Sequence, residues 1–78
     1  MKIIQIEWYD AYSLDSWMRE DVALAGTAEP MLCHTVGYLM KEDEETITVC
    51  HTYNEDKQVC GVMQIPRRCL VDKPKEIG

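Results

Sequence analysis

Apolar and polar side chains alternate along the first segment of the chain. In residues 2–10, with the sequence KIIQIEWYD, Ile4, Ile6 and Trp8 occupy every second position. A period of two places alternate side chains on the same face of an extended strand. The pattern therefore predicts a first strand with these three residues on a buried face and with Tyr9 outside that face.

The spacing of apolar residues changes to that of a helix in residues 13–26, SLDSWMREDVALAG. Ser13 is suited to cap the start of a helix, and Gly26 is suited to end it. The apolar residues between them share one helical face: Leu14, Trp17, Met18, Val22 and Ala25. We expect one short amphipathic helix that packs over the sheet, with Trp17 in the core rather than on a recognition surface.

The remaining two thirds of the chain alternates between β-prone segments and the polar turns KEDE (41–44) and NEDK (54–57). This pattern predicts four more strands, at residues 35–41, 45–53, 58–65 and 69–73. Gly61 is expected to mark a bulge or a tight bend. The predicted fold is mainly β: a single domain over residues 1–78, built as a small SH3-like antiparallel barrel of about five strands with the helix after the first strand. An open five-stranded sheet under one helix is the alternative.

The composition is that of a folded protein, because 46% of the residues are apolar and two Trp and four Tyr are present. No window approaches the ~18 apolar residues of a membrane span. The opening MKIIQIEWYD lacks the apolar region of a signal peptide. We therefore expect a cytoplasmic protein without a membrane partner. The net charge of −6 argues against direct binding to nucleic acid, which requires clustered Lys and Arg.

Four cysteines, at positions 33, 50, 60 and 69, raise the question of a metal site. Zinc ligands in small domains usually come in close pairs such as C-x2-C, and these cysteines form none. Cys50 and His51 are neighbours in a predicted strand, so their side chains point to opposite faces. We expect no metal and free thiols. Catalytic and cofactor-binding motifs are also missing, which predicts a protein that is not an enzyme and has no cofactor.

Charged and aromatic residues near the predicted turns are the candidates for binding a partner. The acidic block Glu42, Asp43, Glu44 and Glu45 either solvates a turn or forms a surface for a basic partner. Arg67 and Arg68 form either a solvated turn or a two-arginine clamp for an anion. Tyr53, beside the NEDK turn, completes the set.

Three segments carry a resemblance to a known group of proteins: IEWYDA (6–11), TVGYLMKEDEETITV (35–49) and QVCGVMQIPRRCL (58–70). The chain resembles small uncharacterised proteins encoded by tailed phages and prophages, which have a similar W-x-D-A opening. The resemblance implies a phage accessory protein expressed in a bacterial cytosol. The stretch IPRRCL is also similar to the entry of the last strand in SH3-like barrels. Because these motifs are structural, the resemblance implies no activity.

Together these observations predict a non-enzymatic phage-type accessory protein that acts by binding a protein of the host or of the phage. An exposed strand edge also favours assembly into a homo-oligomer. One alternative is an acidic inhibitor of a host defence or nucleic-acid-processing protein. The other is a barrel that sequesters a small anion or nucleotide around Arg67 and Arg68.

Overall fold

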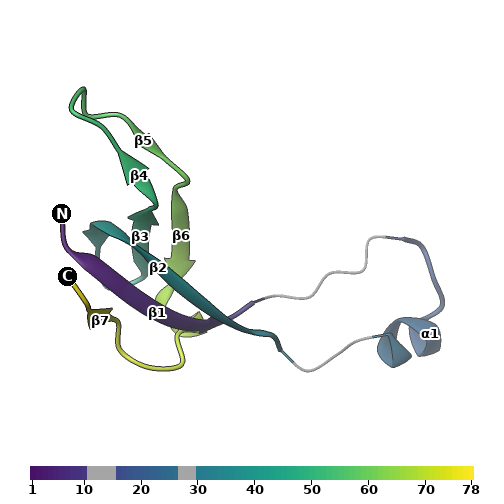
Figure 1. The fold of residues 1–78 in the computed structure, drawn as a ribbon. Helices are drawn as coiled ribbons and strands as arrows, with labels where there is room; N and C mark the ends of the chain where they lie inside the picture. The colour runs from purple at the N-terminus through teal and green to yellow at the C-terminus, as the bar shows by residue number, and fades with distance from the viewer. Residues whose placement is uncertain (11–15, 27–29) are drawn as a thin grey trace.

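Two antiparallel sheets form the fold in the computed structural model, which describes residues 1–10, 16–26 and 30–78 (Figure 1). The larger sheet has five strands in the order β6–β3–β2–β1–β7, and the smaller pairs β4 with β5. In chain order the elements are β1 (Ile3–Tyr9), α1 (Glu20–Ala25), β2 (Leu32–Glu42), β3 (Thr46–Cys50), β4 (Thr52–Tyr53), β5 (Val59–Cys60), β6 (Met63–Pro66), the 3-10 helix η1 (Arg67–Cys69) and β7 (Lys75–Glu76). The predicted mainly-β class with a helix after the first strand is confirmed. The larger sheet has the five antiparallel strands expected for either predicted architecture, and the SH3-like barrel stays a prediction.

The five-stranded sheet is bent, but its edge strands β6 and β7 do not pair with each other in the described part of the chain. Instead, the segment after η1 returns to β1. Leu70 forms an isolated bridge with Trp8, and the Val71 N–H donates a hydrogen bond of 2.9 Å to the Glu7 carbonyl. The pairing of β1 with the C-terminal segment is therefore interrupted, and the strands do not form a continuous ladder around the core.

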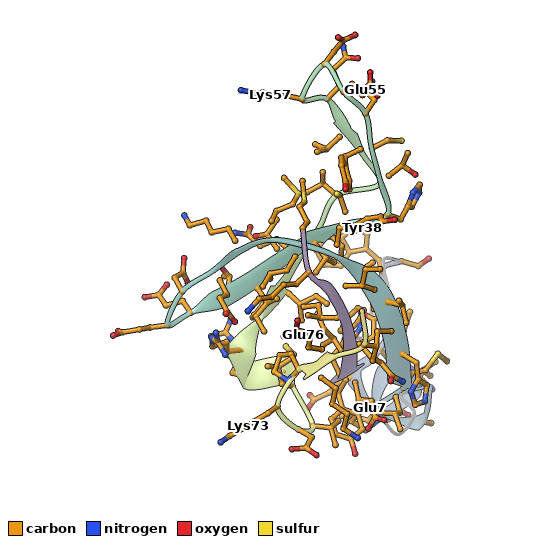
Figure 2. The ribbon with its side chains drawn as sticks, turned by 60° about the vertical axis from the view of Figure 1, so that its left-hand side comes forward. Glu7, Tyr38, Glu55, Lys57, Lys73 and Glu76 are labelled. Carbon is orange, nitrogen blue, oxygen red and sulfur yellow. The ribbon has the colours of Figure 1, made fainter. Side chains whose placement is uncertain are left out.

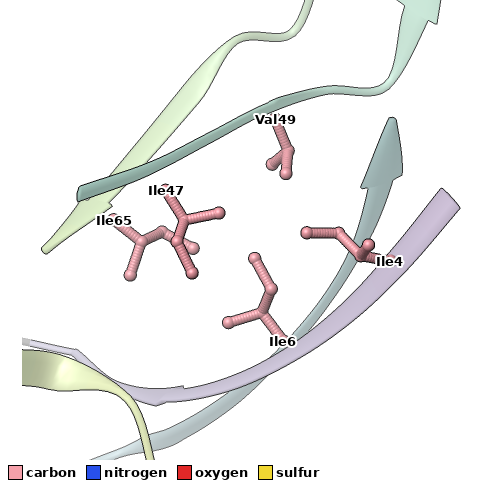
Figure 3. Packing of buried hydrophobic residues seen from close by; sticks show 5 residues of the cluster. All are labelled: Ile4, Ile6, Ile47, Val49 and Ile65. Carbon is pink, nitrogen blue, oxygen red and sulfur yellow. The ribbon is translucent and has the colours of Figure 1, made fainter. Parts of the chain in front are cut away.

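The bend brings the inner face of β1 opposite the inner faces of β3 and β6, and the core lies between them (Figure 3). The buried cluster consists of Ile4, Ile6, Ile47, Val49 and Ile65. Trp8, Leu39, Cys69 and Leu70 pack against it. The alternation predicted for the first strand is confirmed, and Tyr9 is exposed as expected. Full burial of one aliphatic side chain contributes about 1.5–3 kcal/mol, so this small cluster dominates the stability of the sheet.

One long hairpin contains β3 and β4 on one side and β5 and β6 on the other, and it bends between its two ladders (Figure 1). The strands predicted over 45–53 and 58–65 are each interrupted at this bend. The pairing register is the same on both sides of it. The buried positions of β3, Ile47 and Val49, do not continue at the same spacing beyond the bend, because His51 and Tyr53 are exposed. We call residues 52–60, beyond the bend, the hairpin arm.

The bend depends on Gly61, as the sequence predicted. This glycine has a φ of 69°, in the left-handed region that other residues rarely adopt. The ring of His51 lies over it, and a Cβ atom built at Gly61 would be 2.2 Å from His51 Cδ2. The ring is held in place by a contact of 2.8 Å between His51 Nδ1 and Thr52 Oγ1. No side chain fits at position 61 without moving this ring.

The tip of the hairpin arm is organised by Asn54. Its side-chain oxygen accepts hydrogen bonds from the N–H groups of Asp56 and Gln58, at 3.1 and 3.0 Å. Its amide group donates to the Gln58 side chain at 2.8 Å. These local bonds hold the predicted NEDK turn, and Asn is favoured in turns for this reason. The arm is therefore a hydrogen-bonded projection, with Glu55 and Lys57 at its far end (Figure 2).

The predicted helix over 13–26 is much shorter in the structure, and its predicted packing is wrong. Ser13 and Leu14 lie outside the described residues, and α1 is preceded by Arg19, which makes no capping hydrogen bond through its side chain. Trp17 and Met18 precede α1, so the apolar stripe is not one continuous helical face. None of the residues of α1 is buried, and Trp17 is fully exposed.

The position of α1 follows from where the first hairpin ends. The Asp10 N–H donates a hydrogen bond of 3.0 Å to the Met31 carbonyl, which extends the pairing of β1 with β2 to its last residues. Among the described residues, α1 lies past the end of these strands rather than over their face (Figure 1). The prediction that Trp17 joins the core is corrected for this reason.

The last predicted strand, over residues 69–73, is also displaced. Its start belongs to η1, and regular pairing with β1 resumes only at β7, where Lys75 lies opposite Gln5. Pro74 immediately precedes β7. Because proline has no N–H to donate, it favours an interruption of the ladder at this point.

Candidate functional site

The acidic block predicted from the sequence forms the turn between β2 and β3. Its four members are exposed. The Asp43 N–H donates to the Thr46 carbonyl at 3.0 Å. Asp43 Oδ1 in turn accepts hydrogen bonds of 2.9 Å from the N–H groups of both Glu45 and Thr46. The block is therefore an ordered turn closed by one of its own carboxylates.

Arg67 joins this turn, although it lies 25 residues from Glu42 in sequence. Its backbone N–H donates to the Glu45 carbonyl at 2.8 Å. Its guanidinium donates from Nε to the Asp43 carbonyl and from Nη2 to Glu42 Oε2, the latter at 3.2 Å. The side chain is about one-third exposed. Arg67 therefore stabilises the acidic turn. Because its guanidinium is already bonded there, its predicted role as half of a two-arginine clamp for an anion is disfavoured.

Arg68 remains available at the same corner. It is exposed and makes no hydrogen bond or ion pair with any residue in the described ranges. With Pro66 and Arg67 it lines one side of an open hollow, and the other side is formed by Glu44, Glu45 and Thr46. An anion entering this hollow would meet one uncommitted guanidinium beside two carboxylates, which is a poor site for negative charge.

Hydrogen bonds to Asp43 predict a pH dependence of this turn. The N–H donors of Glu45 and Thr46 hold the pKa of the Asp43 carboxyl below its ordinary value of 3.8. Because the folded pKa is lowered, the carboxylate stabilises the turn above pH 3.8, and this contribution is lost as pH falls through the folded pKa.

Asp43→Asn keeps a side-chain oxygen as acceptor but removes the titration. We expect wild type to be more stable than Asp43→Asn at neutral pH and the difference to shrink in acid. Urea melts of both proteins between neutral pH and acid measure this. A difference that stays constant across the range would contradict the assignment.

Tyr53 lies at the opposite end of β3 from the acidic turn, at the base of the hairpin arm. Its ring meets that of Tyr38 edge to face, with centroids 4.9 Å apart and planes at 87°. Tyr53 pairs with Val59 across the arm, so their side chains share a face. Val36, two positions before Tyr38 on β2, lies on the same face as Tyr38. The candidate residues therefore separate into two sites: the acidic turn with both arginines, and the aromatic face around Tyr53.

The aromatic face consists of Val36, Tyr38, Tyr53 and Val59, and only Tyr53 was predicted as a binding residue. Val36 is 55% exposed, Tyr53 45% and Val59 39%, although all three are large apolar side chains. The sequence carried a partial signal, because Val36 and Tyr38 lie opposite in phase to the residues of β2 that face the core. The contact between the two tyrosines depends on the bend and has no signature in sequence.

The prediction that the side chains of Cys50 and His51 point to opposite faces agrees with the structure, in which Cys50 is buried and His51 is exposed. Cys33 and Cys69 are partly buried, and Cys60 is exposed. Among the described residues no group of three His, Cys, Asp or Glu side chains is placed to hold a metal ion. Zinc-free protein stays a prediction, which elemental analysis can test.

One histidine lies against a hydroxyl, because His51 Nδ1 and Thr52 Oγ1 are 2.8 Å apart. A nucleophile activated by histidine also needs a third group that orients the ring. No described carboxylate makes a hydrogen bond with His51. The pair instead stabilises the bend beside Gly61.

The molecule is elongated for its length. Its radius of gyration is 16.0 Å, whereas about 12 Å is expected for a compact domain of this size. The accessible surface is 6406 Å², against about 4,900 Å² expected for a compact monomer of 9.0 kDa. The hairpin arm and α1 both project from the sheet (Figure 1). Within the described ranges, no helix has the length and apolar character needed to cross a membrane.

Comparison with known proteins identifies no relative of this chain. No protein-family model, no curated protein and no solved structure matches the chain.

Proposed function

We propose that the protein is a non-enzymatic binding module that acts by engaging a protein partner through the aromatic face at the base of the hairpin arm. The phage resemblance adds the context of an accessory protein in a bacterial host. The observation that carries the proposal is the exposure of Val36, Tyr53 and Val59 around the Tyr38–Tyr53 pair. Tyrosine is enriched in the buried centres of protein interfaces because it combines a large apolar ring with a hydroxyl group.

Order in the arm supports this choice of surface. The Asn54 hydrogen bonds hold its tip, and the His51–Gly61 contact sets its angle to the sheet. A preformed surface loses less conformational entropy on binding than a mobile one does. Figure 2 shows Tyr38 at the foot of the arm, with Glu55 and Lys57 far from it at the tip. The projecting tip would help to orient a partner that packs against this face.

The acidic turn supports a second candidate, an inhibitor of a basic partner. Glu42 and Asp43 are engaged by Arg67 through a side-chain and a main-chain oxygen, while Glu44 and Glu45 border the open hollow. The net charge of −6 would assist attraction to a basic protein. Binding of this kind weakens steeply with salt, whereas binding through apolar anchors does not. Salt dependence therefore separates the two candidates.

Capture of a partner from a bacterial lysate, with the purified chain immobilised, tests the proposal. We expect one protein to be retained at low and at high salt. Tyr53→Ala combined with Val59→Ala should reduce its retention at least tenfold, as is usual for the central residues of an interface. Cys60→Ser, on the other face of the arm, is the matched control and should retain the partner.

Two results would count against the aromatic face. If the arm variant retains the partner as well as wild type does, another surface binds it. If retention disappears at high salt and in a Glu44→Gln, Glu45→Gln variant, the acidic turn is the binding surface. Circular dichroism of each variant confirms that the sheet is intact.

A further inference from the structure

Three charged side chains at one corner of the sheet have no partner within the described part of the chain. They are Glu44 and Glu45, in the turn between β2 and β3, and Arg68, in η1. All three are exposed, and none makes an ion pair or a side-chain hydrogen bond with another described residue. The adjoining Asp43 and Arg67, by contrast, are engaged in the turn through several hydrogen bonds. The uncommitted charges of this corner are therefore one cation and two anions.

These charges border the same hollow but do not neutralise one another. Glu44 and Glu45 line one side of it with Thr46, and Arg68 lines the other with Pro66. No ion pair between described residues crosses from one side to the other. The volume of the hollow is about 510 Å³, within the range of about 300–1,000 Å³ for small-molecule sites. Opposite charges separated by such a space are complementary to a ligand that carries both a cationic and an anionic group. We call this space the charged hollow.

Hydrogen bonds hold the backbone on both sides of the charged hollow. The Arg67 N–H donates to the Glu45 carbonyl at 2.8 Å, which joins the two sides directly. The Leu70 N–H donates to the Arg67 carbonyl at 3.0 Å and closes η1 around Arg68. On the other side, the Asp43 carboxylate accepts a hydrogen bond of 2.9 Å from the Glu45 N–H. The backbone of the site is therefore in place before a ligand arrives, which lowers the entropic cost of binding.

We propose that the charged hollow binds a ligand in which a carboxylate and a guanidinium or ammonium group lie close together, as in a basic amino acid or a basic residue at the C-terminus of a peptide. The ligand carboxylate pairs with the Arg68 guanidinium, whose planar fork matches two carboxylate oxygens. The cationic groups of the ligand pair with Glu44 and Glu45. A simple anion meets two carboxylates and a simple cation meets Arg68, so the mixed charge of the site selects against both.

The charged hollow is separate from the surface proposed to bind a protein partner. It lies at the start of β3, whereas Tyr53 lies beyond the other end of this strand. Binding in the hollow and capture through the aromatic face can therefore succeed or fail independently. Because ion pairs in an exposed site are weak, we expect a dissociation constant of about 1–10 mM that rises with salt.

Titration of L-arginine into the isotope-labelled full chain, followed by nuclear magnetic resonance, tests the proposal. We expect saturable shifts of the amide signals of Glu44, Glu45 and Arg68. Agmatine is arginine without its carboxylate, and citrulline lacks the guanidinium charge. Each should bind about fivefold more weakly or worse, because each leaves charged groups of the site without a partner.

A short peptide that ends in arginine identifies the source of the ligand. If the ligand is a chain terminus, the peptide with a free C-terminal carboxylate binds at least as tightly as arginine does, and its C-terminal amide does not. If the ligand is the free amino acid, both peptides bind more weakly than arginine, because neither offers the α-ammonium group.

Variants assign the roles of the side chains. Arg68→Gln should weaken the binding of arginine about fivefold or more and leave that of agmatine unchanged, because only arginine offers a carboxylate. Glu44→Gln combined with Glu45→Gln should remove the binding of both compounds. Glu55→Gln combined with Asp56→Asn, at the tip of the hairpin arm, removes the same amount of charge and is the matched control, which should bind arginine as wild type does.

Three results would overturn the proposal. Amide signals of the charged hollow that do not move at tens of millimolar arginine would show that it binds no ligand of this class. Equal affinity for arginine and agmatine would show that Arg68 takes no part. An equal loss in the arm-tip control would mean that arginine is attracted by the net charge of −6 rather than by a site.

Discussion

Replacement of Trp8 by alanine is expected to lower the free energy of unfolding by about 3 kcal/mol, the lower end of the range for removing a large aromatic from a core. Trp8 is only partly buried, but it packs against the Ile cluster, and its indole N–H donates a hydrogen bond of 2.9 Å to Thr35 Oγ1. It also bridges to Leu70, which brings the C-terminal segment back to β1. In a domain this small, whose total stability lies near the lower end of ~5–15 kcal/mol, such a loss is large.

Trp17→Ala is the matched control for this experiment. Its effect on unfolding should stay within about 0.5 kcal/mol, as for other surface substitutions. Thr35→Val separates the hydrogen bond from the packing and should cost about 1 kcal/mol. Urea melts followed by circular dichroism compare the three variants with wild type. Equal losses for the two tryptophans would mean that residues 16–26 pack on the sheet, as the sequence pattern had predicted.

Replacement of Gly61 by alanine is the second large effect, with an expected loss of about 2–3 kcal/mol. The left-handed conformation at this position costs a residue with a Cβ about 1–2 kcal/mol. A further cost of about 1 kcal/mol arises because the new Cβ displaces the His51 ring into a less favourable rotamer. The bend joins the arm to the sheet, so the arm should lose amide protection first.

A double-mutant cycle with His51→Ala isolates the steric part of this loss. Without the ring, Gly61→Ala should cost only the backbone conformation, about 1–2 kcal/mol. Hydrogen exchange of residues 52–60 and urea melts of the four proteins measure both effects. If the cost of Gly61→Ala is the same with and without His51, the ring does not constrain the bend.

The first strand and the turns show how much local pattern can predict. The alternation of Ile4, Ile6 and Trp8 depends only on the pleat of one strand, and it identified the face that the core uses. Asn54 makes its hydrogen bonds within four residues of itself, so the turn it forms is also a local property. Gly61 could be predicted to mark a bend because its conformational freedom needs no neighbour.

The helix shows where the same reasoning fails. Helical spacing says which side chains would share a face if residues 13–26 were helical throughout, but not whether a surface exists for that face to cover. In the structure, the bend of the sheet places the inner face of β1 opposite β3, β6 and the segment after η1, and Ile47, Ile65 and Leu70 from these segments pack there. No place is left on that face for Trp17, and α1 lies beyond the strands.

Both candidate sites depend on contacts that cross the chain. The sequence indicated an acidic turn and a basic pair, and it left their relation open because Arg67 lies 25 residues from Glu42. The acidic turn and Arg67 come into contact because β6 pairs with β3. This pairing places Arg67, which follows β6, beside the turn that precedes β3. The Tyr38–Tyr53 contact likewise requires the bend at Gly61, which tilts the arm relative to the sheet.

By itself, the sequence determined the strand periods, the buried face of β1, the polar turns and the glycine at the bend, because each of these depends on neighbours along the chain. Only the tertiary structure decided that Arg67 fastens the acidic turn, that Tyr53 meets Tyr38 and that Trp17 stands in solvent. Those outcomes depend on which faces come to oppose each other when the sheet bends, and a side-chain period carries no information about the partner that a face will meet.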